Sequence, residues 1–331
     1  MDKVFCFGEI LLHFSPKVNS DFIADQNMPF CLGGAELNVA TALANWKLPV
    51  AYGTAMPDNF LSKAITTNLS AKHIDTSPIH FSGNRMGIFY LAQGMDMKNA
   101  AVVFDRADSS FANLQKGMID WKKQLQGIGW FHITAISASL TQSATEVCLE
   151  ALETASAMGI PISIDLNYRP KLWQYGKTPL EVMPELVKYA NVVMGNLWAV
   201  EKMLGVKSTI KESAGSSVDQ LNNAAKESMD QLSVLYPKAQ HIAYTFRLEN
   251  EYHGVLKQED QLFISKLYAL DNIINIVGSG DCFMAGLIFA IQQNQTPQDK
   301  INFAAAAGVG KLYELGDATD QTIEQIKKRM S

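Results

Sequence analysis

The sequence contains few cysteines, and their spacing does not suggest a metal site or a disulfide framework. Four of the 331 residues are cysteine, Cys6, Cys31, Cys148 and Cys282, and no two of them form a C-x-x-C pair. Three of the four lie in apolar runs, where a thiol packs like a small hydrophobic side chain. We therefore expect reduced core thiols and a protein of the reducing cytoplasm.

Long apolar runs and a strong excess of one charge are also missing. The longest apolar stretch, residues 282–291, is far shorter than the roughly 20 residues that a membrane-spanning helix needs. The N-terminal residues lack a basic region, and the apolar run after them is broken at Gly8 and Glu9, so no signal peptide is expected. A formal net charge of -5 gives no reason to expect nucleic acid or an anionic membrane as a partner.

What the sequence does contain is a repeated alternation of strand-like and helix-like segments. Short apolar or β-branched runs at residues 4–7, 130–133, 162–164, 192–194 and 242–245 are separated by longer stretches with apolar residues at helical spacing. This pattern is typical of a parallel sheet covered by helices. Several runs lead directly into polar residues, such as Asp165, Asn196 and Arg247. Parallel sheets bind ligands at the carboxyl ends of their strands, so these residues are candidates for a site.

Two segments interrupt this alternation. Residues 87–92 and 101–104 are strand-like, are separated by the turn-forming stretch 94–99, and have no long helix between them, which predicts an antiparallel hairpin. Together with the irregular segment 14–32, the hairpin is expected to form a small sheet that projects from the main domain as a lid. Residues 211–217 are expected to be a surface insertion.

The segment 277–288 carries the clearest chemical signal. Gly278, Ser279, Gly280 and Asp281 precede apolar positions at helical spacing, so they are predicted to lie at a helix N-terminus. Free backbone N–H groups at such a terminus bind anions, and glycine lets the backbone approach a phosphate closely. Asp281 would then orient and deprotonate an attacking hydroxyl during phosphoryl transfer. The alternative is that Asp281 is only a helix N-cap and that the glycines only permit a tight turn.

This G-S-G-D string resembles the G-A-G-D motif of the ribokinase-like (PfkB-family) carbohydrate kinases. Near the N-terminus, Gly33 and Gly34 begin a string that resembles the G-G-x-x-x-N-x-A sugar-binding motif of the same family, with Asn38 at the asparagine. The resemblance implies a ribokinase-like three-layer α/β sandwich over residues 1–331, with a central, mainly parallel sheet and a small β-sheet lid from about 14–32 and 84–110. It also implies ATP and Mg²⁺, with metal ligands unknown, and a homodimer or higher homo-oligomer formed through the lid.

Residues 165–173 are similar to the D-x-N-x-R-x-x-L-W string of 2-keto-3-deoxygluconate kinases and of their relatives, the fructokinases. Alternate residues after a strand point the same way, so Asp165, Asn167 and Arg169 are expected to share one face of the cleft. The planar fork of Arg169 suits a sugar-acid carboxylate. A structural ion pair between Arg169 and Asp165 is the open alternative.

Further site residues follow from the resemblance alone. Tyr90 and Arg106 match a tyrosine and an arginine that ketodeoxygluconate kinases direct at their substrate from the lid. The alternative for Tyr90 is a cross-strand packing residue in a small sheet. The positions that match the nucleotide site of the family are Asn196, Thr245, Arg247, Gly278, Gly280 and Asn302.

Three positions depart from the family pattern. Asn275 replaces the first aspartate of D-x-x-G-A-G-D, and Ala199 replaces the glutamate of N-x-x-E. Phe104 stands where these kinases usually have a lid tyrosine, so one hydroxyl that could bind a sugar acid is missing. The first two changes leave the handling of the metal and of ATP open.

The sequence therefore predicts ATP-dependent phosphorylation of the primary hydroxyl of a sugar or sugar acid, with 2-keto-3-deoxygluconate as the leading substrate. One alternative is a fructokinase or another neutral-sugar kinase on the same scaffold. A second is a sugar-binding regulator without catalysis, which the intact G-S-G-D argues against. The particular sugar, the oligomer size and any dependence on a monovalent ion stay open.

Overall fold

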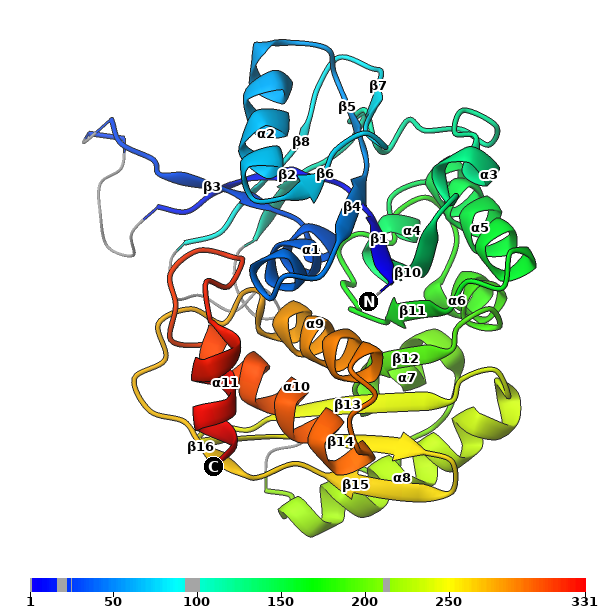
Figure 1. Ribbon diagram of the computed structural model, residues 1–331, viewed down its shortest axis with the longest axis vertical. Helices are drawn as coiled ribbons and strands as arrows, with labels where there is room; N and C mark the ends of the chain where they lie inside the picture. The colour runs from blue at the N-terminus through cyan, green and yellow to red at the C-terminus, as the bar shows by residue number, and fades with distance from the viewer. Residues whose placement is uncertain (1, 17–22, 25, 93–101, 211–214) are drawn as a thin grey trace.

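A large sheet forms the centre of the protein. The computed structural model describes residues 2–16, 23–24, 26–92, 102–210 and 215–331. The strand order of the sheet is β15-β14-β13-β12-β11-β10-β1-β4-β6, with β16 also paired to β14 (Figure 1). Its strands are β1 (Lys3–Phe7), β4 (Val50–Gly53), β6 (Ile74–Asp75), β10 (Ile128–Thr134), β11 (Ile162–Asp165), β12 (Val192–Gly195), β13 (His241–Arg247), β14 (Glu251–Gln258), β15 (Gln261–Ile264) and β16 (Tyr268–Ala269).

Most of this sheet is parallel, as the sequence predicted. Neighbouring strands from β6 through β1 to β13 run parallel, and only the pairs that involve β14 are antiparallel. All five strands expected from the sequence lie within β1, β10, β11, β12 and β13. The carboxyl ends of these five parallel strands therefore lie along one edge of the sheet.

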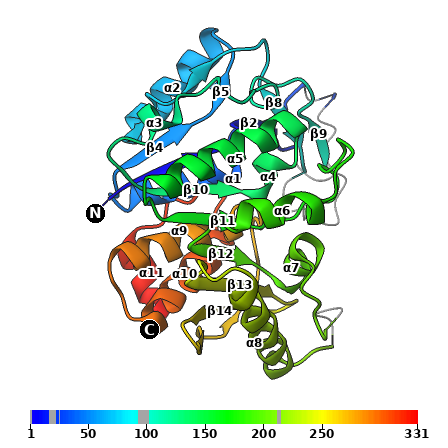
Figure 2. The same cartoon turned by 90° about the vertical axis from the view of Figure 1, so that its right-hand side faces the viewer.

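Helices cover both faces of the sheet, because alternate residues of each buried strand point to opposite sides. In β1, Phe5 and Phe7 pack into one core, and Val4 and Cys6 pack into the other. Figures 1 and 2 show the two helical layers. The first core is covered by α3 (Trp121–Gln124), α4 (Ala135–Ala138), α5 (Gln142–Ala157), α6 (Pro179–Val187), α7 (Leu197–Leu204) and α8 (Val218–Leu235). The second is covered by α1 (Ala35–Asn45), α2 (Phe60–Ala71), α9 (Ser279–Gln292), α10 (Pro297–Lys311) and α11 (Ile323–Met330).

A separate sheet of four strands stands beside the main one. Its order is β3-β2-β8-β9, and β8 and β9 are antiparallel, as predicted for the hairpin. The strands are β2 (Leu11–Phe14), β3 (Phe30–Gly33), β8 (Gly87–Tyr90) and β9 (Val103–Asp105), and a further pair consists of β5 (Ala55–Met56) and β7 (His80–Phe81). The sheet thus begins at Leu11, earlier than the expected segment 14–32.

Parts of three predicted segments lie outside the described residues. They are residues 93–101 of the hairpin, which include its turn 94–99, residues 17–22 and 25 of the irregular N-terminal segment, and residues 211–214 of the expected insertion. Ser217, at the end of that insertion, is the N-cap of α8. Among the described helices, none combines the length and the apolar character that crossing a membrane requires.

Candidate active site

A cavity of about 710 Å³ opens at the carboxyl ends of the parallel strands, next to the small sheet. Most residues that the sequence singled out line this cavity: Gly34, Asn38, Arg106, Asp165, Asn167, Arg169, Asn196, Thr245, Arg247, Gly278, Ser279, Gly280 and Asp281. They come from segments separated by almost the whole chain. The fold therefore gathers into one space residues that the sequence could connect only through motifs.

The glycine turn lies directly before α9. Gly278 is the N-cap of this helix and has φ 81°, a left-handed conformation that favours glycine. A Cβ atom at Gly278 would lie 1.9 Å from the carbonyl oxygen of Asp317, whereas one at Gly280 would meet only the Met194 side chain, at 3.9 Å. The hydroxyl of Ser279 donates to the carbonyl of Gly308 at 2.9 Å, which fixes the first turn of α9 to α10. Gly278 is thus needed for the turn itself, whereas a methyl group at Gly280 would make only an ordinary contact with Met194.

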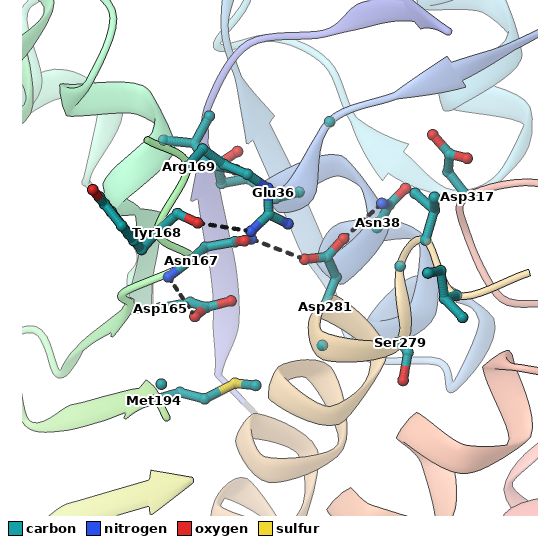
Figure 3. A pocket seen from close by; sticks show the side chains of 18 of the residues that line it. Glu36, Asn38, Asp165, Asn167, Tyr168, Arg169, Met194, Ser279, Asp281 and Asp317 are labelled. Atoms are coloured by element: carbon teal, nitrogen blue, oxygen red, sulfur yellow. Dashed lines mark hydrogen bonds between the residues drawn. The ribbon is translucent and has the colours of Figure 1, made fainter. Parts of the chain in front are cut away.

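Asp281 lies in the first turn of α9, and Gly278, not Asp281, caps the helix. Its carboxylate accepts hydrogen bonds from Asn38 Nδ2 at 2.7 Å and from Asn167 Nδ2 at 3.4 Å. Figure 3 shows the carboxylate between these two amides, with Arg169 nearby. Burial, together with the charge of the nearby Asp165, raises the pKa of Asp281 to about 7, against the hydrogen bond from Asn38. A carboxylate with such a pKa is suited to accept a proton near neutral pH.

The segment after β11 supplies a second group of polar side chains. The Asp165 carboxylate accepts from the backbone N–H of Asn167 at 3.0 Å, and this local bond directs Asn167 toward Asp281 (Figure 3). Burial raises the pKa of Asp165 to about 6, although the Asn167 bond and the Arg169 charge lower it. Arg169 donates from Nη1 to the carbonyl of Tyr168 at 3.1 Å. As expected from their alternation, all three polar side chains line one cavity.

Two buried glutamates belong to the site, and the sequence reasoning did not assign a role to either. Glu9 follows β1 and accepts from Arg106 Nε at 2.7 Å, so it holds the guanidinium against the cavity. Glu36 lies in the first turn of α1 and accepts from Thr134 N, Thr134 Oγ1 and Ser137 Oγ at 2.8–3.0 Å. Glu9 had one usable signal, since it is a polar residue two positions after a predicted strand. Glu36 sits inside the G-G-x-x-x-N-x-A string, where its burial could not be read from spacing.

The buried groups of the cavity that have no hydrogen-bond partner among the described residues include two acceptors that carry no proton of their own to donate. They are Glu9 Oε1 and Asn38 Oδ1. Unsatisfied buried oxygens cost free energy, so such atoms usually have a partner in the functional complex. Sugar hydroxyls are donors of the required kind.

Some predicted residues are placed differently. The ring of Tyr90 stacks on Phe14 with centroids 5.5 Å apart, and it is the neighbouring Phe89 that lines the cavity. Gly33 is buried but is not part of the lining. Asn302 accepts a hydrogen bond from Gln298 on α10 and also lies outside the lining. The structure therefore does not bring these three residues to the cavity.

The side chain of Asn196, one of the positions that match the nucleotide site of the family, has a structural partner. Its Oδ1 atom caps α7 by accepting from the N–H of Ala199 at 2.9 Å. Thr245 and Arg247 line the cavity near the end of β13. Asn275, one of the departures from the family pattern, accepts from Val277 N and donates to the carbonyl of Gly316 at 2.7 Å. Asn275 thereby connects the segment before the glycine turn to the loop after α10.

That loop also contacts the small sheet. His13 Nδ1, on β2, lies 2.9 and 3.0 Å from the two carboxylate oxygens of Asp317, and Cys31 Sγ lies 3.5 Å from the same ring nitrogen. Among the described residues, these three form a group whose donor atoms could hold a metal ion, since they lie within 4.8 Å of one another. The carboxylate is already bonded to the ring, so the group is satisfied without an ion.

The fold and the site together define a class of protein. A mainly parallel sheet, a cavity at its carboxyl ends and a carboxylate beside a glycine turn are the features expected of the ribokinase-like carbohydrate kinases. The sequence pattern of the pfkB family of carbohydrate kinases matches residues 1–322. The chain belongs to this family.

Three individual carbohydrate kinases are similar to this chain. The 2-dehydro-3-deoxygluconokinase of Thermotoga maritima has a similar structure, with a TM-score of 0.89 and 30% identity, over 100% of this chain and 99% of that one. The 2-dehydro-3-deoxygalactonokinase of Haloferax volcanii is 28% identical over 167 residues, which are 50% of this chain and 52% of the relative. The fructokinase of Vibrio alginolyticus is 24% identical over 202 residues, 58% of this chain and 60% of the relative. The chain thus spans little more than half the length of these last two relatives.

Proposed function

We propose that the protein transfers the γ-phosphoryl group of ATP to the primary hydroxyl of 2-keto-3-deoxygluconate, also called 2-dehydro-3-deoxygluconate. The observation that carries the proposal is the placement of Asp281. Its carboxylate lies beside the glycine turn at the N-terminus of α9, in a cavity that also contains arginine side chains and unsatisfied acceptors. The relative from Thermotoga maritima supports the choice of sugar acid.

The proposed reaction follows from this arrangement. Asp281 takes the proton as the hydroxyl oxygen forms its bond to the γ-phosphorus, and the bond from that phosphorus to the ADP oxygen breaks. The backbone N–H groups of the turn, Gly278 to Gly280, stabilise the charge on the transferring group. Mg²⁺ offsets the charge of the phosphates when it is bound. Asp165 lines the cavity and would offer carboxylate oxygens, the type of ligand that this ion prefers.

We assign substrate recognition to a second set of polar residues in the cavity. Asn38 Oδ1 and Glu9 Oε1 accept sugar hydroxyls, because both atoms are buried and lack a partner among the described residues. Arg169 binds the carboxylate of the sugar acid through its planar fork. Arg106 is held in place by Glu9 at the side of the small sheet and completes the polar wall.

The small sheet is proposed to act as a lid, and a homodimer or higher homo-oligomer would form through it. Three cavity residues from this sheet support a lid. Leu11 lies on β2, Phe89 lies on β8, and Arg106 directly follows β9. We also propose a reducing, cytoplasmic location. It is supported by the four cysteines, all of which are free thiols in the structure.

The decisive assay measures ADP release with MgATP across 2-keto-3-deoxy sugar acids, fructose, ribose and adenosine. We expect the highest kcat/KM with 2-keto-3-deoxygluconate. A preference for fructose would favour the second candidate function, a fructokinase, to which the relative from Vibrio alginolyticus points. Absence of turnover with every sugar, together with retained sugar binding, would indicate a regulator instead.

The role of Asp281 is tested by Asp281→Asn. The amide keeps a similar shape but cannot accept the hydroxyl proton, so kcat should fall roughly 10²- to 10⁴-fold while sugar affinity and thermal midpoint are retained. Both kcat and sugar Kd are measured on the purified variant. Near-normal turnover would remove the general-base assignment.

A further inference from the structure

Lys311, the last residue of α10, is a fully buried ammonium that the proposed mechanism does not use. Its relative exposure is 0%. Its Nζ atom donates to the carbonyl oxygen of Glu314 at 3.4 Å, and this is the one hydrogen bond that the described residues provide. An ammonium has three N–H donors. A buried charge with so few partners is costly unless it serves an anion that binds nearby.

The position of Lys311 identifies where that anion would be. Its Cε atom lies 3.3 Å from the point where a Cβ atom at Gly278 would be, so the lysine lies directly against the glycine turn. Figure 1 shows α10 beside α9, the helix that this turn begins. Lys311 is not among the residues that line the cavity. Lys311 therefore packs against the turn without lining the cavity itself.

The helix dipole explains the position of Lys311 at the end of α10 but not its burial. A cation in the last turn of a helix interacts favourably with the helix dipole, and Lys311 has that position in α10. Such lysines can keep the ammonium in water, however, and this one does not. Burial is also the main cause that lowers the pKa of Lys311, against the nearby carboxylates of Glu314, Asp317 and Asp281.

We propose that the Lys311 ammonium is a built-in positive charge behind the glycine turn, which strengthens the turn's attraction for the transferring phosphoryl group. This inference rests on the proposed function for the identity of the anion. Lys311 is then a positioning residue, because it acts through Gly278 and not by touching the substrate. Its charge adds to that of the helix N-terminus, and both matter most when negative charge builds up during transfer.

The first test compares Lys311→Met with the control Lys300→Met. Methionine keeps much of the volume of lysine and removes the charge. Lys300 is also a buried lysine of α10, but its Nζ atom bonds Gln258 at 3.0 Å and it does not line the cavity. We expect Lys311→Met to lower kcat about 10- to 100-fold, less than the loss of a direct oxyanion donor. Its thermal midpoint should stay the same or rise, because a buried charge is removed. Lys300→Met should leave kcat unchanged.

Chemical rescue supplies a readout that a structural role would not give. In Lys311→Ala, the truncated side chain leaves room for a small cation, so ammonium or methylammonium chloride should restore part of kcat. Tetramethylammonium chloride, which is too large for the space of a lysine head group, should not. If kcat and the thermal midpoint fall together and no amine restores turnover, Lys311 is structural and the proposal is overturned.

A binding measurement separates this inference from the proposed function. Calorimetry compares the Kd of ADP with that of the non-hydrolysable ATP analogue AMP-PNP, and needs no sugar. Lys311→Met should weaken AMP-PNP more than ADP, because the charge acts on the terminal phosphate. This result would stand even if no sugar in the panel is phosphorylated, in which case only the proposed substrate fails. An unchanged ratio of the two Kd values, with kcat within about twofold of wild type where turnover is seen, would overturn the role of Lys311.

Discussion

Arg169→Ala separates the sugar-acid kinase from a neutral-sugar kinase. The side chain lines the cavity beside Asp165 and Asn167, and its charge acts on the Asp281 carboxylate. If Arg169 binds the substrate carboxylate, its removal deletes a charge-assisted hydrogen bond of roughly 1.5 to 3 kcal/mol. At about 1.4 kcal/mol per factor of ten, kcat/KM for 2-keto-3-deoxygluconate should fall about 10- to 150-fold. Activity on fructose, which has no carboxylate, should hardly change.

Removing Arg169 should also change the pKa of Asp281. The positive charge of Arg169 lowers the pKa of Asp281, which burial has raised to about 7, so the variant should have a still higher pKa at its base. The acid limb of kcat/KM would then move to higher pH for every sugar. The comparison is therefore made on the alkaline plateau, where Asp281 is ionised in both proteins. On that plateau only the loss of carboxylate binding remains.

The refuting result is an equal loss of kcat/KM for acid and neutral sugars on the plateau. Arg169 would then be a structural partner of Asp165, and the fructokinase interpretation would take precedence. Arg169→Lys is the matched control, because it restores the charge without the planar fork and should rescue the sugar acid only in part.

Two further predictions use the neighbours of Asp281. Burial is the main cause of the raised pKa of Asp281, and the negative charge of Asp165 raises this pKa as well. Asp165→Asn should therefore move the acid limb of the pH profile of kcat/KM to lower pH. An unshifted acid limb would mean that the two carboxylates do not interact. In Gly280→Ala the added Cβ would meet only the Met194 side chain, at 3.9 Å, so the thermal midpoint should be unchanged. The methyl group would crowd the approach of a phosphate to the backbone of the turn, so kcat should fall. Gly278→Ala should lower the thermal midpoint by contrast, since its φ is 81° and its Cβ would meet the Asp317 carbonyl at 1.9 Å. Equal thermal losses in both glycine variants would show that Gly280, like Gly278, is needed for the turn itself.

The parallel sheet could be predicted from the sequence because its signals are local. Five apolar runs have the length and composition of buried strands, and each lies within a strand of the structure. The polar residues after them line the cavity because parallel strands end on the same edge. The early start of the small sheet at Leu11 could not be seen, since β2 and β8 pair across a long sequence separation.

The site was less predictable wherever a role depends on distant neighbours. Tyr90 matched a family position, but the strand periodicity turns it toward Phe14 and directs Phe89 to the cavity. Glu9 acquires its role from Arg106, which lies 97 positions away along the chain. The burial of Lys311 depends on the packing of α10 against the glycine turn. Contacts of this kind have no signature in the local sequence pattern.

The hydrogen bond between Asn38 and Asp281 has a consequence for synthesis and folding. The two residues are 243 positions apart, and the bond joins the first helix to the one that follows the glycine turn. The chain leaves the ribosome N-terminus first, and contacts between distant segments form late because a long loop must close. Asn38 is therefore made long before its partner, and its amide stays in contact with water until α9 docks on α1. The site should consequently appear as one of the last events of folding, after the N-terminal strands have paired.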